Sequence, residues 1–309
     1  MRFVTFQTAE SAPRPGVLSL DRSSVIDLGA HFPDMLSLMD RGREGLDIAR
    51  DFQAKGGLSH PLDKVQLRAP VPRPRQMRDF MCSAQHARDG SRGMARLKAK
   101  LANQPPPDIN SINFPEVYKQ LPVFYFTNRN SVSGPDDDIL WPRYSSFLDY
   151  ELELGVFIGR EGKNISVADA GAHIFGYTIF NDFSARDRQA HEMTGFLGPA
   201  KGKSFDTGNA IGPWIVTPDE IQNVYDLDVQ VRVNGEVWAR GSTAEKFHTF
   251  EETIAFVSED ETLVVGEMFG SGTMGGCCGL EIDRWLKHGD VLELEVSGIG
   301  VLRNRIVRQ

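Results

Sequence analysis

Three acidic residues are spaced so that they could hold a metal ion. Glu151 and Glu153 alternate in Asp149-Tyr-Glu-Leu-Glu-Leu-Gly155, so on a strand both carboxylates would project from one face, about 7 Å apart. Asp182 ends the apolar run Phe175-Gly-Tyr-Thr-Ile-Phe-Asn-Asp182, where an unpaired buried carboxylate would be costly. Three oxygen ligands from two strands suit Mg²⁺, Mn²⁺ or Ca²⁺ better than Zn²⁺.

The same alternation also fits a solvent-exposed strand that binds nothing. Leu292-Glu293-Leu294-Glu295-Val296 repeats the pattern and offers an internal comparison. Cationic and amide donors follow the third acid closely, in Arg186-Asp-Arg-Gln189 and in Gly202-Lys203. A charged, solvated helix followed by a glycine turn would give the same residues. Spacing alone therefore leaves a metal site and a charged surface both open.

Short strands must position these residues, because strand-like runs dominate from residue 120 onward. We expect strands over 149–158, 175–181, 229–233, 237–239, 291–296 and 302–307. Asn234-Gly235 supplies the positive φ angles of a tight hairpin turn. Short helices are expected near 166, at 217–220 and over 250–257. The expected fold class is α+β and mostly β, a mixed β-sandwich or β-roll.

Residues 1–70 are expected to form a small α+β cap domain. Strand-like runs at 2–5, 17–20 and 25–28 accompany helical spacing over 34–54. Pro70-Val-Pro-Arg-Pro-Arg75 cannot be helical, since proline lacks the backbone N–H, so the boundary is placed there and the second domain covers 71–309. A basic helical patch and Gln104-Pro-Pro-Pro-Asp108 make 87–115 either a lid over the site or a plain exposed loop.

Composition excludes several function classes. A formal charge of -8 and a pI near 5.4 argue against a nucleic-acid partner or an anionic membrane surface. No apolar run approaches the roughly 20 residues that span a bilayer, and the first residues lack a signal-peptide core, so a cytoplasmic protein is expected. The three cysteines have no metal-binding spacing and are interpreted as reduced and incidental.

The order of several motifs resembles the fumarylacetoacetate hydrolase family. They are Asp149-Tyr-Glu-Leu-Glu153, Asn181-Asp-Phe-Ser-Ala-Arg-Asp187, Lys201-Gly-Lys-Ser-Phe205, Gly270-Ser-Gly-Thr273 and the closing segment 286–305. The likeness extends from about Arg78 to the C-terminus and implies a β-roll decorated with helices, a catalytic domain that follows the small N-terminal domain. It also implies a homodimer.

The resemblance further implies a role for each site residue. Glu151, Glu153 and Asp182 would ligate the cation, Mg²⁺ first among the candidates, and Asp79 would add a fourth carboxylate. His86 matches the segment that bears the general base. Its orienting acid is either Glu281, which matches the family acid, or Asp89 three residues later. Residues expected to contact the substrate are Arg186, Gln189 and Lys203 as charge-stabilising donors, with Tyr125 and Thr273.

The reaction expected from this resemblance is hydrolysis of a carbon–carbon bond in a 2,4-dioxo acid, with His86 activating water and the cation stabilising the enolate. Oxaloacetate decarboxylation, or hydration, isomerisation or dehydration of a 2-oxo acid, would exploit the same cation and stays open. A non-catalytic binding protein is the remaining alternative. Asp206 and Met193 depart from fumarylacetoacetate hydrolase itself, so fumarylacetoacetate is not the expected substrate.

Overall fold

Two large β-sheets and one two-stranded sheet form the framework of residues 1–308, the part of the chain that this computed structural model describes. The larger sheet has twelve strands in the order β4-β3-β2-β1-β14-β12-β11-β17-β6-β7, with β5 beside β1 and β8 beside β14. Its strands are β1 (Arg2–Gln7), β2 (Arg14–Leu18), β3 (Ser24–Asp27), β4 (Ser59–Pro61), β5 (Gln66–Arg68), β6 (Met77–Phe80), β7 (Phe124–Phe126), β8 (Val132–Ser133), β11 (Leu152–Ile158), β12 (Ile174–Asp182), β14 (Asn209–Val216) and β17 (Met268–Gly270).

The smaller sheet has five strands in the order β16-β15-β18-β19-β9, and β10 pairs with β13 in a short ribbon of its own. These strands are β9 (Asp138–Trp141), β10 (Leu148–Asp149), β13 (Ser184–Ala185), β15 (Asp228–Val233), β16 (Glu236–Ser242), β18 (Val291–Val296) and β19 (Gly300–Arg308). Parallel pairs (β17 with β6, β19 with β9) occur among antiparallel ones, so both large sheets are mixed.

Strand alternation divides the core between the two faces of the larger sheet. Leu152, Leu154 and Val156 of β11 join one buried cluster with the inward side chains of β15 and β18. Phe157 of the same strand lies in a second cluster, together with side chains from the N-terminal strands and helices. Because both faces are covered, β11 and β12 are buried along their whole length. The polar side chains of these strands must therefore find partners inside the protein.

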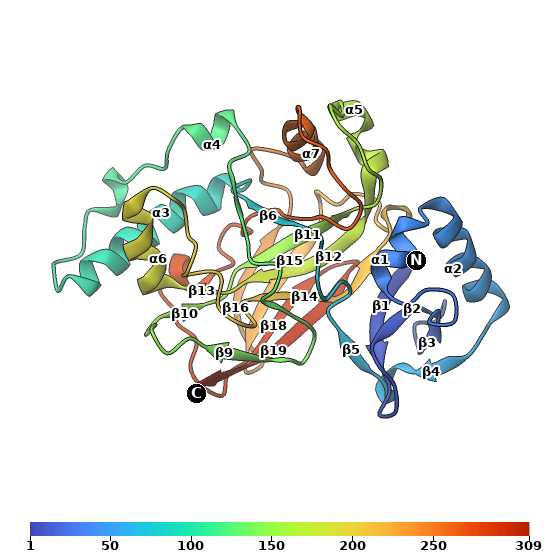
Figure 1. Ribbon diagram of the computed structural model, residues 1–309. Coiled ribbons are helices and arrows are strands. Elements are labelled where there is room, and N and C mark those ends of the chain that lie inside the picture. Colours follow the sequence, from blue (N-terminus) through green and yellow to red (C-terminus); the bar gives the residue numbers. More distant parts are fainter. Residues whose placement is uncertain (309) are drawn as a thin grey trace.

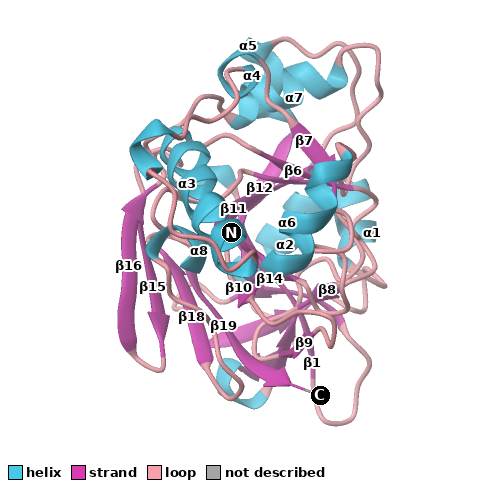
Figure 2. Ribbon diagram, turned by 90° about the vertical axis from the view of Figure 1, so that its left-hand side faces the viewer, coloured by secondary structure: helices cyan, strands magenta, loops and turns pink. Residues whose placement is uncertain are grey.

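Eight α-helices occur among the described residues, and most lie at the ends of the sheets. They are α1 (Met35–Asp40), α2 (Arg43–Lys55), α3 (Ala84–Leu101), α4 (Val117–Gln120), α5 (Val167–Ala170), α6 (Arg186–Glu192), α7 (Phe250–Ser258) and α8 (Gly279–Ile282). Figure 1 shows α3, α4 and α6 at the end of the molecule away from the blue N-terminal strands, and Figure 2 shows α3 and α6 on that face. None of these helices is both long and apolar enough to cross a membrane.

The expected α+β, mostly β sandwich is confirmed, with local corrections. The predicted strand over 149–158 is wrong in its continuity, because it divides into β10 and β11. The backbone N–H of Glu151, at the break, bonds the Asn181 side-chain oxygen at 3.0 Å instead of a ladder partner. The predicted helix over 34–54 is two helices, separated at Gly42 with its positive φ of 52°. The helix at 217–220 is a single 3₁₀ turn, Pro218–Glu220.

The N-terminal strands extend the larger sheet. Phe3 of β1 pairs with Ile215 of β14 in antiparallel register, and β1 also pairs with β2 and β5. Phe3 also packs its ring 5.4 Å from that of Phe175 on β12. The boundary near residue 70 therefore remains a prediction, and strands from both sides of it share one sheet.

Helix α3 packs closely on α8 through Gly93. A Cβ atom at Gly93 would stand 2.3 Å from the Leu280 carbonyl oxygen, which is backbone and cannot swing aside. We expect Gly93→Ala to lower the free energy of unfolding by about 1–3 kcal/mol through overpacking. Gly171→Ala is the control, because a Cβ there meets nothing within 4 Å. Urea unfolding of both variants checks this, and equal stability of the two would contradict the close approach.

Candidate active site

Three buried carboxylates from neighbouring strands meet at one point. Asp79 lies on β6, Glu153 near the start of β11 and Asp182 at the end of β12. One carboxylate oxygen of each lies within 4.8 Å of the others. Gly270 of β17 separates β11 from β6 here, and a Cβ on it would stand 2.6 Å from Asp79 Oδ1 and 2.9 Å from Glu153 Oε2. The missing side chain leaves room beside the acids.

These acids lack enough donors for their oxygens. Asp79 Oδ1, Glu153 Oε1 and Asp182 Oδ1 are buried and accept no hydrogen bond from any described residue. Burial and the neighbouring acids raise the pKa of Glu153 well above its usual value, and burial raises the pKa of Asp79 and of Asp182 as well. Orphaned carboxylate oxygens that converge on one point fit a hard divalent cation. Asp79, Glu153 and Asp182 therefore fit a divalent-cation site.

Glu151 has a different environment from the other three acids. Its Oε1 lies 2.7 Å from Arg186 Nη2, and its Oε2 lies 2.5 Å from Lys203 Nζ. Burial would raise the pKa of Glu151, but the charges of Arg186 and Lys203 outweigh burial and hold that pKa below its usual range. Lys203 Nζ also lies 2.5 Å from Asp182 Oδ2, so its ammonium group bridges the two acids. Glu151 thus borders the cluster as a paired carboxylate.

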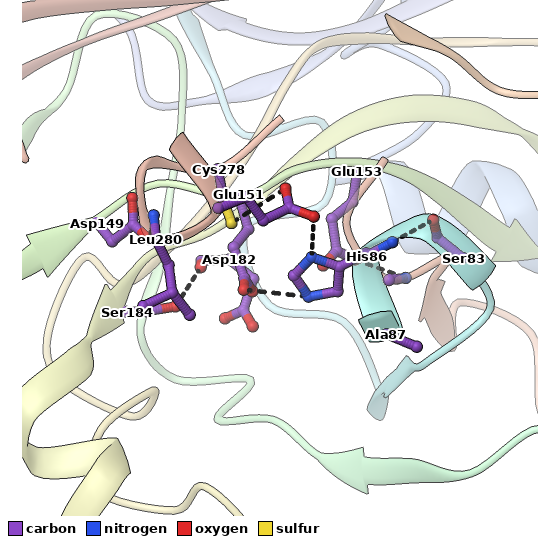
Figure 3. Close-up of polar contacts among 12 residues, drawn as sticks. Ser83, His86, Ala87, Asp149, Glu151, Glu153, Asp182, Ser184, Cys278 and Leu280 are labelled. Atoms are coloured by element: carbon purple, nitrogen blue, oxygen red, sulfur yellow. Dashed lines mark hydrogen bonds and ion pairs between the residues drawn. The ribbon is translucent and has the colours of Figure 1, made fainter. Parts of the chain in front are cut away.

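His86 and Glu281 form the pair that could move a proton. His86 Nδ1 lies 3.2 Å from Glu281 Oε1, and His86 Nε2 lies 3.8 Å from Glu151 Oε1. Figure 3 shows the His86 ring pointing from α3 toward the acids, beside the Ser83 that caps this helix. Burial lowers the pKa of His86, but the charge of Glu281 and its contact with the ring outweigh this effect and raise that pKa.

Asp89, the other candidate for the orienting acid, faces elsewhere. Its Oδ1 lies 3.2 Å from both Arg88 Nε and Arg92 Nη1. No ion pair joins it to His86 within the described part of the chain. Between the two acids that the sequence left open, the geometry favours Glu281.

The remaining expected residues line the same space. Gln189 Oε1 accepts from Arg186 Nη1 at 3.0 Å, and the Tyr125 phenol donates to Asp182 Oδ2 at 2.5 Å. Burial, followed by the charge of Asp182, raises the pKa of Tyr125 well above its usual value. The Thr273 hydroxyl is buried without a partner among the described residues. All eleven residues expected from the sequence therefore lie in one region.

A cavity of about 480 Å³ opens over these groups. Polar side chains from His86, Glu151, Glu153, Arg186 and Lys203 occupy its floor, and Thr273 joins them. Its remaining wall is largely apolar and includes Met94, Phe124, Tyr118, Met193 and Leu280. The space can hold a small molecule with a polar end directed at the acids and a less polar remainder.

Two residues at the site were missed as functional candidates. Asp149 opens the acidic motif, yet no role followed from its position; its carboxylate bonds Arg186 and the start of α8. Cys278, interpreted as incidental, places its Sγ 3.4 Å from Glu281 Oε2. Its position three residues before Glu281, one helical turn away, was the available signal. All three cysteines are free and buried, as expected for reduced thiols.

Known proteins resemble this chain in sequence and in fold. The family model described as fumarylacetoacetate (FAA) hydrolase C-terminal matches residues 76–307. A bovine (Bos taurus) protein named oxaloacetate tautomerase FAHD2A, mitochondrial, is 32% identical over 318 residues, covering 99% of this chain and 92% of that protein. The solved fumarylacetoacetate hydrolase of Exiguobacterium antarcticum is 27% identical with a TM-score of 0.76, and the alignment covers 100% of both chains.

A third similar protein is the maleylpyruvate hydrolase of Sphingobium sp. SYK-6, solved in complex with manganese(II) ion and pyruvate. It is 22% identical with a TM-score of 0.75, over 100% of this chain and 99% of its own, and at that identity the likeness concerns the fold alone. The family match spans the strands that hold the acids, the His86 helix and the Glu281 segment. This chain therefore belongs to the fumarylacetoacetate hydrolase family.

Proposed function

We propose that this chain is a divalent-metal-dependent isomerase that interconverts the keto and enol forms of a small 2-oxo acid of the oxaloacetate type. The observation that carries the proposal is the His86–Glu281 pair, with its 3.2 Å contact, directed at a cluster of buried acids. Such a reaction needs one group that takes a proton from carbon and returns it to oxygen. The tautomerase name of the bovine relative supports the same reaction class.

Asp79, Glu153 and Asp182 would hold the cation, with Glu151 beside them. A divalent ion bound there would withdraw electrons from a 2-oxo group and so ease removal of a proton from the adjacent carbon. Mg²⁺ is our first candidate and Mn²⁺ the second, since both take carboxylate oxygens.

The protein's own groups divide the proton transfer among them. Glu281 at Nδ1 keeps the proton on that nitrogen, which leaves Nε2 of His86 as the base facing the cavity. Nε2 takes the proton from carbon 3 of the substrate and returns it to the oxygen on carbon 2, so atoms and charge balance over the cycle. Lys203 and Arg186 offer positive charge to the substrate oxygens. Their ion pairs with the acids hold these two basic side chains in place.

Hydrolysis of a carbon–carbon bond in a 2,4-dioxo acid, the reaction expected from the sequence, is the second candidate. The cavity of about 480 Å³ favours it, because oxaloacetate would leave space for an acyl group and a water molecule. His86 would then remove a proton from water instead of carbon. Decarboxylation, hydration and dehydration use the same residues, and we rank them behind these two.

The test supplies the enol form of oxaloacetate and an acylpyruvate to the Mn²⁺-loaded protein and follows the enol absorbance and product formation. Loss of the enol signal with recovery of intact oxaloacetate supports the isomerase. Release of pyruvate from the acylpyruvate assigns the hydrolase, and release of carbon dioxide assigns the decarboxylase. No turnover together with saturable metal binding would leave the binding protein as the remaining function.

Lys203 provides a test of the electrostatics at the site. We expect Lys203→Met to destabilise the metal-free protein, because its ammonium group bridges Glu151 and Asp182 at 2.5 Å. The same change should tighten Mn²⁺ binding about tenfold, since a buried positive charge no longer opposes the cation. Calorimetric titration checks this, with Lys201→Met, two residues away and exposed, as the control. Weaker metal binding in Lys203→Met would contradict this account.

The homodimer and the cytoplasmic location expected from the sequence remain proposals. The bovine relative is named as mitochondrial, which concerns that protein alone. Sedimentation at several concentrations would measure the assembly state of this chain. Fractionation of the source cells would measure its location.

A further inference from the structure

Asp149 is a fully buried carboxylate that does not line the cavity. It ends β10, opposite Ser184 of β13. Its Oδ1 accepts from the backbone N–H of Gly279 at 2.7 Å and of Tyr150 at 2.9 Å. Its Oδ2 accepts from the Leu280 N–H at 2.9 Å and from Arg186 Nε at 2.8 Å. Four donors satisfy both oxygens, as many as a carboxylate ordinarily takes.

These donors come from two helices that carry different residues of the site. Gly279 and Leu280 are the first residues of α8, the short helix that carries Glu281 and therefore one side of the proton-transfer pair. Arg186 begins α6, and its other nitrogens contact Gln189 and Glu151, the acid that borders the carboxylate cluster. Figure 3 shows Asp149 beside Leu280, on the far side of Glu151 from His86. One carboxylate thus ties the Glu281 helix to the Arg186 guanidinium group.

The local sequence is fitted to this contact. A Cβ on Gly279 would stand 2.5 Å from Asp149 Oδ1, so glycine is what allows the carboxylate to reach the helix N–H groups. An asparagine at position 149 would present N–H groups to at least one of these donors, which cannot accept them. The contact requires a carboxylate at this position.

We propose that Asp149 is a positioning residue that fixes Glu281 and Arg186 relative to each other, and through Glu281 the orientation of the His86 ring. The proposal rests on the proposed function only for its kinetic readout. Asp149 touches neither the cavity nor any orphaned acid, so it acts through the groups it holds. Replacing Asp149 should therefore lower kcat without displacing the bound metal ion.

The first variant is Asp149→Asn, compared with Asp290→Asn as the matched control. Asp290 is also buried and accepts from a backbone N–H, that of Lys287, and from the Asn234 amide, away from the cavity. We expect Asp149→Asn to lower kcat for enol conversion 10- to 100-fold and to change Mn²⁺ affinity less than threefold. Asp290→Asn should keep kcat within twofold, although both variants lose stability.

The second readout needs no turnover, so it separates this proposal from the proposed function. Proton NMR of the Mg²⁺-loaded protein would record the ring N–H signal of His86, assigned by its absence in His86→Ala. We expect this signal to shift or broaden in Asp149→Asn and to stay unchanged in Asp290→Asn. If Asp149→Asn does not fold, Asp149→Glu keeps the buried charge but displaces it by one methylene, and the same shift is expected. An unchanged ring signal in a folded Asp149 variant would overturn the proposal.

Discussion

Replacing His86 with alanine is expected to lower kcat for enol conversion by about 10²- to 10⁴-fold, the usual contribution of a positioned general base. Nε2 of His86 faces the cavity, and no other histidine lines it among the described residues. The acids proposed to bind the metal are untouched by this change, so Mn²⁺ affinity should stay within about threefold of that of the unaltered protein. Stopped-flow absorbance with oxaloacetate enol, beside a calorimetric titration, measures both quantities.

His191→Ala is the control, because His191 is an exposed histidine on α6, the helix that also bears Arg186 and Gln189. It should leave both kcat and metal affinity unchanged. Two further variants test which acid orients the His86 ring. Glu281→Gln should reduce kcat strongly, whereas Asp89→Asn should not. Full activity of His86→Ala would remove the proton-transfer role from this residue and with it the mechanism proposed above.

Glu153→Gln is expected to abolish the stabilisation that Mg²⁺ or Mn²⁺ gives to the folded protein. At a cation concentration 100 times its Kd, the unaltered protein should gain about 2.7 kcal/mol of unfolding free energy, and the variant should gain almost none. Without metal, Glu153→Gln should have the opposite effect and raise the free energy of unfolding. The pKa of Glu153 is raised in the folded state by burial and by Asp79, so at pH 7 this acid costs stability that a neutral amide does not. The metal-free variant should therefore melt higher.

Glu295→Gln offers the matched control, because Glu295 stands in the Leu-Glu-Leu-Glu run of β18 with the same alternation. Its carboxylate pairs with Arg232 at 2.5 Å and is partly exposed. Thermal melts with and without Mg²⁺ should show the unaltered response in Glu295→Gln and no response in Glu153→Gln. Equal metal-induced shifts in both variants would place the cation elsewhere.

The sequence identified the residue types of the site better than their partners. The family motifs pointed to Glu153 and Asp182, and the fold places both within reach of Asp79. Alternation along a strand, however, says which face a side chain occupies and not what stands opposite. Glu151 and Glu153 both line the cavity, but only the fold shows that Glu151 has Arg186 and Lys203 as its partners. Where β10 and β11 divide, the Glu151 N–H bonds the side chain of Asn181, 30 positions away in the sequence.

The choice between Glu281 and Asp89 could not be made from spacing either. Asp89 is a helical neighbour of His86, which favoured it locally, whereas Glu281 approaches through the packing of α8 on α3. That packing relies on Gly93 and on the closeness of two segments almost 200 positions apart. Local helix propensity accounts for the helix that carries His86. Only the long-range packing determines which acid lies beside the His86 ring.

The pairing of β1 with β14 affects how the whole chain folds and how it avoids aggregation. Without residues 1–68, the backbone groups of β14 around Ile215 would form an open sheet edge, next to apolar side chains such as Phe175 that β1 now covers. Open edges of this kind recruit strands from other molecules and promote aggregation. The N-terminal segment therefore acts as an intramolecular protecting strand, and we expect it to unfold with β14 and β12 in one cooperative transition.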